Sequence, residues 1–122
     1  MSKRTILLVE DDDIIRLLLK TMLEAIPDYE VIESPNGANA LALLSSKKPH
    51  IDAAVLDIMM TGHGGSVGDY LKKDPQYDNT LIIYHTGLNK NQFDNKILEG
   101  ALYVNKGKES INKIAEILKE QL

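Results

Sequence analysis

The sequence predicts an α/β fold in which a doubly wound, five-stranded parallel sheet carries helices on both faces. Short apolar runs alternate with longer segments of helical periodicity, this alternation occurs five times along the chain, and the connections are short. A strand that is followed by a helix and then by another strand normally runs parallel to it, and the covering helices bury the strands on both faces.

The first strand and helix have the clearest pattern. Residues 5–9 (TILLV) form a continuous apolar run, which is typical of a strand buried on both faces. Apolar residues recur at helical spacing over residues 14–26. Asp12 or Asp13 can cap the start of this helix, and Pro27 prevents its continuation.

The second and third strands are predicted from shorter runs. Residues 29–34 alternate between polar and apolar side chains, as a strand does, and residues 36–48 then form a helix that begins at Asn36 and Gly37. Residues 53–56 (AAVL) form the third strand, and Asp57 stands at its end.

Glycine dominates the segment that follows the third strand. We expect residues 61–68 (TGHGGSVG) to form a mobile loop, and a short helix near residues 69–73 to follow it. The remaining predicted elements are strands at 81–85 and 102–105, a helix at 91–99 and a closing amphipathic helix at 111–122.

Length and composition favour one domain spanning residues 1–122. The chain has no cysteine, which excludes disulfides, thiolate metal sites and a cysteine nucleophile. Its net charge of −4 argues against nonspecific binding to nucleic acid or to anionic membranes. No apolar run approaches the roughly 20 residues that span a bilayer, and no signal peptide is evident, so we expect a cytoplasmic protein.

Polar residues follow four of the five strands at the point where each strand ends. They are Glu10 and Asp11, then Asp57, Thr86 and Lys106. Ligands of open α/β sheets bind beyond the carboxyl ends of the strands. These side chains are therefore candidates for holding a hard cation or a phosphoryl group.

The three acids would repel one another at one edge of a sheet, which either raises a pKa or recruits a cation. Mg²⁺ suits this set, because it prefers carboxylates, waters and phosphate oxygens. Lys106 and Thr86 complement a phosphate, and a carboxylate such as Asp57 can attack phosphorus to form an acyl phosphate.

Four segments carry a family resemblance: residues 6–12 (ILLVEDD), 55–60 (VLDIMM), 82–87 (IIYHTG) and 101–107 (ALYVNKG). In order and spacing they are similar to the receiver domains of response regulators, of the chemotaxis-regulator type. The resemblance covers essentially the whole chain. It implies a flavodoxin-like sheet of order 2-1-3-4-5.

The resemblance also implies a role for each site residue. Asp57 would accept the phosphoryl group, Asp11 would bind Mg²⁺ directly and Glu10 through water, and the Met59 backbone carbonyl would be a further ligand. Lys106 would pair with phosphoryl oxygens.

Two more positions correspond to the family's switch. Thr86 would hydrogen-bond a phosphoryl oxygen, and Tyr103 would turn inward when Thr86 moves. The surface of the fourth helix, fifth strand and fifth helix would then bind a downstream protein.

The implied function is a phosphorylation-dependent signalling switch in a two-component phosphorelay, and not an enzyme. The donor would be a phosphohistidine on a sensor histidine kinase or a phosphotransfer protein. Neither nucleic-acid binding by this chain nor membrane insertion is expected.

The sequence departs from the family pattern near the site. Gly107 replaces the usual proline after the lysine. A cis bond to a residue other than proline costs about 2.5–4 kcal/mol, which favours a trans Lys106–Gly107 bond but leaves the isomer and the exact placement of the Lys106 ammonium open. Thr61 replaces a usual proline in the loop after Asp57. Met59 and Leu88 are apolar and cannot orient a hydrolytic water, which predicts slow self-dephosphorylation.

Several alternatives remain at this point. Thr86 can instead cap a turn, and Tyr103 can be a packing residue. A dehalogenase-type phosphatase with the pattern D-x-D-x-T would match residues 57–61 except at Met59. A receiver that binds partners without being phosphorylated is a further alternative. The acid pair, Asp57 and Lys106 argue against it, while Gly107 leaves it open. A flavin carrier of the same topology would need aromatic residues, and the chain has no Trp and one Phe.

Overall fold

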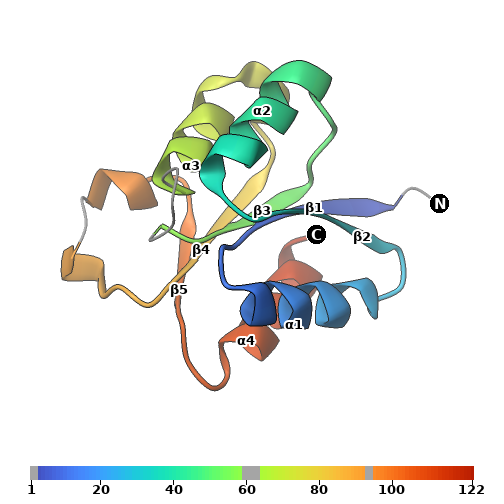
Figure 1. The fold of residues 1–122 in the computed structure, drawn as a ribbon, viewed down its shortest axis with the longest axis vertical. Helices are drawn as coiled ribbons and strands as arrows, with labels where there is room; N and C mark the ends of the chain where they lie inside the picture. Colours follow the sequence, from blue (N-terminus) through green and yellow to red (C-terminus); the bar gives the residue numbers. More distant parts are fainter. Residues whose placement is uncertain (1–2, 59–63, 93–94) are drawn as a thin grey trace.

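The sheet order confirms the predicted topology (Figure 1). The computed structural model describes residues 3–58, 64–92 and 95–122, and within these ranges five parallel strands form one sheet in the order β2-β1-β3-β4-β5. The strands are β1 (Arg4–Val9), β2 (Tyr29–Ser34), β3 (Ala53–Leu56), β4 (Leu81–Thr86) and β5 (Leu102–Asn105).

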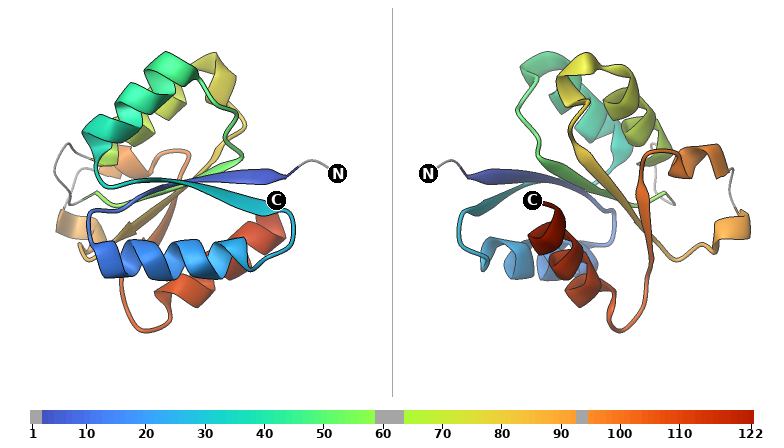
Figure 2. Two further views of the ribbon diagram at one scale, coloured as in Figure 1. Left: turned by 45° about the vertical axis from the view of Figure 1, so that its right-hand side comes forward. Right: turned by 180° about the vertical axis from the view of Figure 1, so that it is seen from behind.

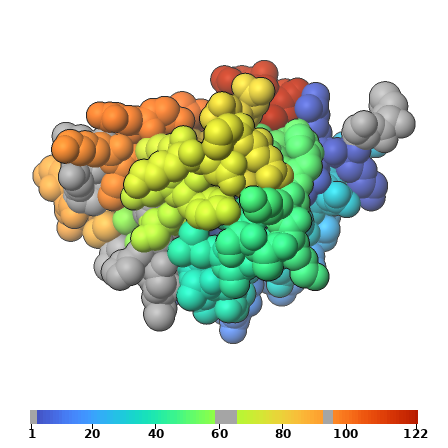
Figure 3. Space-filling view, turned by 90° about the horizontal axis from the view of Figure 1, so that it is seen from above, coloured from blue at the N-terminus to red at the C-terminus, as the bar shows by residue number. Residues whose placement is uncertain are grey.

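Helices cover both faces of the sheet, as Figure 2 shows. The α-helices of the described ranges are α1 (Asp13–Glu24), α2 (Gly37–Lys47), α3 (Gly64–Lys73) and α4 (Ser110–Gln121). Helices α1 and α4 pack on one face and α2 and α3 on the other, and each face has its own buried apolar cluster. Figure 3 shows the outer surface of the α2 and α3 layer. The 3₁₀ segments are η1 (Pro75–Tyr77), η2 (Lys90–Gln92) and η3 (Asn95–Leu98).

Side-chain caps begin the first two helices where the sequence predicts them. The Asp12 carboxylate accepts hydrogen bonds from the backbone N–H groups of Ile14 and Ile15, at 2.9 and 3.0 Å. The Asn36 side chain accepts from Asn39 N–H at 2.8 Å. Such caps satisfy donors that have no partner within the helix. The Asp12 cap also fixes the direction in which the chain leaves β1, next to the edge of the sheet.

The prediction of a loop through residue 68 is wrong, because α3 begins at Gly64. Val67 and Leu71 are one helical turn apart and fully buried, and they anchor the helix on the sheet. Gly68, between them, brings the helix close to Tyr84 of β4. Apolar burial therefore outweighs the low helix propensity of glycine. The rest of the predicted loop, residues 61–63, lies outside the described residues.

The predicted helix at residues 91–99 is also different in the structure. The described part of this segment forms the 3₁₀ pieces η2 and η3, while residues 93–94 lie outside the description. Ile97 and Leu98 pack against the core cluster, whereas Lys90–Gln92 is exposed. Burial of apolar side chains thus stabilises a single turn at η3. The described residues of this segment do not form the continuous apolar stripe that would stabilise an amphipathic helix.

No helix in the described parts of the chain has the length and apolar character needed to cross a membrane.

Candidate functional site

Glu10, Asp57 and Lys106 follow β1, β3 and β5 directly, and backbone hydrogen bonds of the sheet continue to these residues, while Thr86 is the last residue of β4. Asp57 N–H donates to the Val9 carbonyl at 3.1 Å, and Glu10 N–H donates to the Ser34 carbonyl at 3.2 Å. Lys106 N–H donates to the Thr86 carbonyl at 2.8 Å. These bonds fix the backbone of three site residues at one edge of the sheet, as expected from the parallel topology.

Three carboxylates meet at this edge. One oxygen from each of Glu10, Asp11 and Asp57 lies within 4.8 Å of the other two. Glu10 and Asp57 are 1% and 3% exposed, while Asp11 faces solvent. An all-oxygen donor set with one exposed member fits a hard divalent cation that retains several waters. The donor set therefore matches the Mg²⁺ site that the sequence predicts.

Lys106 supplies the positive charge of the site. Its ammonium group donates to Asp57 Oδ2 at 2.7 Å and lies 3.0 Å from Glu10 Oε1. Burial alone would lower the pKa of Lys106, but the hydrogen bonds to Asp57 and Glu10 outweigh it and raise the pKa. The side chain is therefore charged at neutral pH and partly neutralises the two buried acids.

Glu10 titrates near neutrality. Burial, reinforced by the negative charge of Asp57, raises the pKa of Glu10 from 4.5 to about 7, although the hydrogen bond from Lys106 opposes the shift. One lysine therefore does not fully compensate two buried carboxylates. A divalent cation at this edge would favour the ionised form of Glu10.

Thr86 is fully buried at the end of β4. Its hydroxyl oxygen accepts a hydrogen bond from Leu88 N–H at 3.2 Å, so that it caps the turn after the strand. In this arrangement the hydroxyl caps a turn, which is the structural alternative that the sequence leaves open for Thr86. This bond uses a lone pair of the hydroxyl oxygen and does not use the hydroxyl proton.

Tyr103 lies on β5 beside the same turn and is half-buried. Its hydroxyl donates to the Leu88 carbonyl and accepts from the Asn105 side-chain amide at 2.8 Å. The Lys90 ammonium lies 5.3 Å from the centre of the ring. Tyr103 and Thr86 thus both bind the backbone of Leu88, and they are connected through this one residue.

A family model for the response regulator receiver domain matches residues 6–117. This chain belongs to that family. As a receiver domain of two-component signalling it has a regulatory fold, and hybrid histidine kinases contain receiver domains similar to it.

Curated relatives resemble this receiver domain over part of their length. The probable transcriptional regulator ycf27 of Galdieria sulphuraria is 41% identical over 58 residues, which are 48% of this chain and 22% of that protein. A cyclic di-GMP phosphodiesterase of Thermotoga maritima is 34% identical over 89 residues, or 65% of this chain and 23% of that protein. The match spans less than a quarter of the length of both relatives.

Solved receiver structures match the whole chain. The response regulator TrrA of Thermotoga maritima, in complex with Mg²⁺–BeF, has a TM-score of 0.81 and 30% identity, with 98% of this chain and 99% of that chain covered. The receiver domain of the hybrid histidine kinase CckA has a TM-score of 0.74 and 29% identity, with 97% and 98% covered.

The structure decides the isomer of the Lys106–Gly107 bond, which the sequence leaves open. The described residues contain no cis peptide bond, so the Lys106–Gly107 bond is trans. Met59, the predicted carbonyl ligand, lies outside the described residues.

The sequence does not identify three polar residues around the site. Asn105 donates to the Thr86 and Leu88 carbonyls as well as to Tyr103, and His85 pairs with Ser110 at 2.8 Å. The only feature of the sequence that could indicate these residues is a polar side chain within or next to a buried strand. That signal does not reveal the partner, which lies up to 25 residues away.

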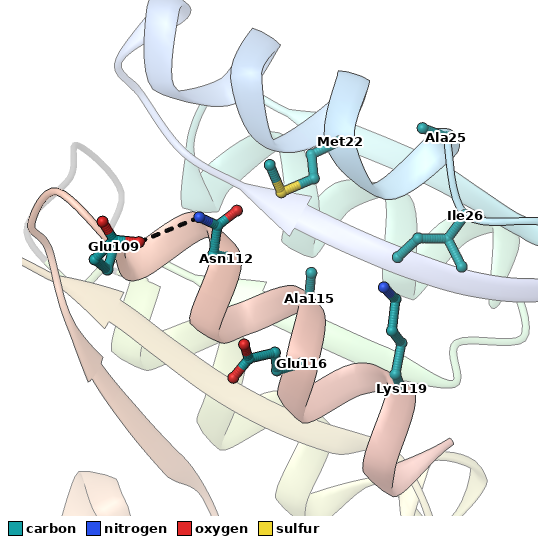
Figure 4. A pocket seen from close by; sticks show the side chains of 8 residues that line it. All are labelled: Met22, Ala25, Ile26, Glu109, Asn112, Ala115, Glu116 and Lys119. Carbon is teal, nitrogen blue, oxygen red and sulfur yellow. Dashed lines mark hydrogen bonds between the residues drawn. The ribbon is translucent and has the colours of Figure 1, made fainter.

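A surface pocket lies between α1 and α4 (Figure 4). It is lined by Met22, Ala25, Ile26, Glu109, Asn112, Ala115, Glu116 and Lys119. None of the predicted site residues lines it, so the pocket is separate from the chemistry proposed below.

Proposed function

We propose that this receiver domain is a phosphorylation-dependent switch in which Asp57 accepts a phosphoryl group from a phosphohistidine. The donor is a sensor histidine kinase or a histidine phosphotransfer protein. The observation that carries the proposal is the convergence of Glu10, Asp11, Asp57 and Lys106 at one edge, with Lys106 Nζ 2.7 Å from Asp57 Oδ2. A nucleophilic carboxylate, a cation site and an ammonium group are what phosphoryl transfer needs.

The acids of the site are the proposed ligands of Mg²⁺. Asp11, Asp57 and the Met59 backbone carbonyl would bind it directly, and Glu10 through water. The Mg²⁺–BeF complex of the similar regulator TrrA supports this assignment. When bound, Mg²⁺ neutralises charge on the acids and on the phosphoryl oxygens. The exposure of Asp11 leaves a path from solvent to the ligands.

The proposed reaction forms one bond and breaks another. A carboxylate oxygen of Asp57 attacks phosphorus, and the P–N bond to the donor imidazole breaks. The bonding electron pair stays on the imidazole nitrogen, and the product on this chain is an aspartyl phosphate. The Lys106 ammonium exchanges a carboxylate oxygen for a phosphoryl oxygen, which stabilises the charge of the transferred group.

The switch is proposed to run from Thr86 to Tyr103. When Thr86 moves toward the phosphoryl group and its hydroxyl donates to a phosphoryl oxygen, this movement breaks the hydrogen bond that the hydroxyl accepts from Leu88 N–H. The Tyr103 hydroxyl donates to the Leu88 carbonyl, so a movement of the turn at Leu88 changes the hydrogen bond that holds the Tyr103 ring in place. The surface formed by η2, η3, β5 and α4 would then bind a downstream protein.

Three further parts of the proposal concern the whole chain. Residues 1–122 act as one receiver domain, and the signalling takes place in the cytoplasm, where kinase partners are found. The chain is a phosphoacceptor and not an enzyme acting on other substrates. Leu88 and Met59 do not orient a hydrolytic water, so the aspartyl phosphate is expected to persist for longer than seconds after the donor is removed.

Intact-mass measurement after incubation with Mg²⁺ and acetyl phosphate tests the proposal. Wild type should gain one phosphoryl group, while Asp57→Asn and wild type in EDTA should gain none. Asp78→Asn, at an exposed aspartate, is the matched control and should be phosphorylated like wild type. Equal labelling of Asp57→Asn would refute the proposal, and turnover of a generic phosphate ester would instead indicate a phosphatase.

A further inference from the structure

His85 is a buried histidine next to the site that the proposed chemistry does not use. It is 2% exposed, precedes Thr86 on β4 and lies on the sheet face covered by α1 and α4. Its Nε2 atom is 2.8 Å from the hydroxyl oxygen of Ser110, the first residue of α4. Strand β4 and helix α4 are thus connected by a side-chain hydrogen bond beside the connection that carries Lys106.

The neighbours of Ser110 determine the direction of this hydrogen bond. The Ser110 hydroxyl donates its single proton to the Gly107 carbonyl at 2.9 Å and accepts from Gly107 N–H at 3.3 Å. With its proton on the Gly107 carbonyl, the oxygen can only accept from His85, so in this arrangement His85 Nε2–H is the donor. Burial and the charge of Lys106 lower the pKa of His85 to about 4, so at neutral pH the ring is neutral and carries its proton on Nε2.

The Ser110 hydroxyl binds both backbone groups of Gly107, and Ser110 N–H also donates to the Gly107 carbonyl at 3.2 Å, so the hydroxyl matters most for the Gly107 N–H. The backbone on the other side is held as well, since Lys106 N–H donates to the Thr86 carbonyl at 2.8 Å. Lys106 thus lies between two anchored peptide groups. The position of its backbone decides where a long and flexible lysine side chain can place its ammonium group.

Gly107 contributes no stiffness of its own. A Cβ atom at this position would meet nothing within 4 Å, and the bond before it is trans. Glycine is the residue with the greatest backbone freedom, so the connection depends on outside contacts for its order. Among the described residues, the hydrogen bonds of Gly107 that supply this order are made with Ser110, whose hydroxyl in turn accepts a hydrogen bond from His85.

We propose that His85 and Ser110 are positioning residues, which fix the backbone beside Lys106 and thereby hold its ammonium group against Asp57. The inference rests on the proposed role of Lys106 in phosphoryl transfer. It identifies two side chains that act through Lys106 and do not touch the phosphoryl group. In this chain they supply order that a glycine after the lysine cannot provide.

The first test compares phosphorylation rates with acetyl phosphate and Mg²⁺. Ser110→Ala should slow the reaction by about tenfold, because small displacements of a positioned group reduce rates strongly. Ser110→Thr keeps the hydroxyl and should recover most of the rate. Ser46→Ala is the matched control, since the exposed Ser46 hydroxyl donates only to the Ala42 carbonyl within α2. Thermal melting of each variant shows that it is folded.

The second test separates positioning from a general structural role. In a Lys106→Ala background, Ser110→Ala should have no further effect, because residues that act through one group are not additive. His85→Leu should slow the reaction in the presence of Lys106, while His85→Gln should not, because the glutamine amide places an N–H donor near the position of Nε2. Equal slowing by Ser110→Ala in both backgrounds would overturn the inference.

A measurement that needs no phosphorylation completes the design. The protein is labelled with ¹³Cε-lysine and kept free of metal, and the NMR signal of Lys106 is assigned by its loss in Lys106→Ala. In Ser110→Ala, the chemical shift of this signal should move toward the shifts of the exposed lysines. In Ser46→Ala it should not change. An unmoved signal overturns the inference, even if Asp57 is phosphorylated. A moved signal in a protein that takes up no phosphoryl group would retain the positioning role and reject the proposed function.

Discussion

A Cβ atom built on Gly68 would lie 1.9 Å from the hydroxyl oxygen of Tyr84. Helix α3 and strand β4 therefore approach each other so closely that only glycine fits at this position. Tyr84 is fully buried, and its hydroxyl has no hydrogen-bond partner in the described part of the chain. This contact sets how closely α3 approaches the sheet.

Gly68→Ala should destabilise the protein by about 1–3 kcal/mol, because the added methyl group overlaps a buried ring and forces the helix to shift. Urea unfolding measures the loss. Gly87→Ala is the matched control, since a Cβ there meets nothing within 4 Å. Tyr84→Phe removes the overlapping oxygen and should recover part of the stability of Gly68→Ala. A Gly68→Ala protein as stable as wild type would contradict the predicted contact.

Lys106→Met should lower the free energy of unfolding by roughly 2–3 kcal/mol in EDTA, because it leaves Glu10 and Asp57 buried without their cation. Added Mg²⁺ should restore much of this loss, since a bound cation replaces the missing charge and binding stabilises the folded state. Urea unfolding at neutral pH with and without Mg²⁺ measures both effects. Lys119→Met, at an exposed position of α4, should change neither value. A variant that Mg²⁺ does not rescue would argue against a metal site here.

Glu10 should make the metal-free protein less stable as pH rises. The folded state raises the pKa of Glu10 from 4.5 to about 7, so between these values the folded protein binds a proton that the unfolded chain releases. Its contribution to stability is present below pH 4.5 and is lost as pH rises through 7. The difference in unfolding free energy between wild type and Glu10→Gln, measured in EDTA from pH 5 to 8, should follow this direction. Glu120→Gln is the exposed control, and an unchanged difference would contradict the prediction.

His85 should have the opposite effect at lower pH. Burial, aided by the charge of Lys106, lowers the pKa of His85 from 6.5 to about 4, so the unfolded chain binds a proton that the folded protein excludes. Stability should therefore fall as pH decreases from 6.5 to 4, by on the order of 3 kcal/mol. Urea unfolding measures the effect: between pH 6.5 and 4, the unfolding free energy of wild type should fall by this amount more than that of His85→Gln, which has no titrating ring. His50→Gln provides the control, since His50 is 77% exposed, and a parallel pH dependence of wild type and His85→Gln would refute the prediction.

Local patterns in the sequence predicted most of the fold. Alternating apolar runs identified the five strands, and Asp12 and Asn36 marked two helix starts, because both signals depend on neighbours within one turn or one strand. The acids and the lysine at the strand ends followed from the parallel topology. The start of α3 and the segment between β4 and β5 were predicted wrongly, since burial against distant residues decided them.

The sequence by itself determined which chemical groups stand at the carboxyl edge of the sheet, because the ends of buried strands can be recognised from local periodicity. The tertiary structure alone decided which groups touch: the Lys106 bonds to two acids, the connection of Thr86 and Tyr103 through Leu88, the fit of Gly68 against Tyr84 and the pairing of His85 with Ser110. These contacts join residues on different elements, and their distances depend on how helices pack on the sheet. No pattern within a few residues of the sequence encodes that packing.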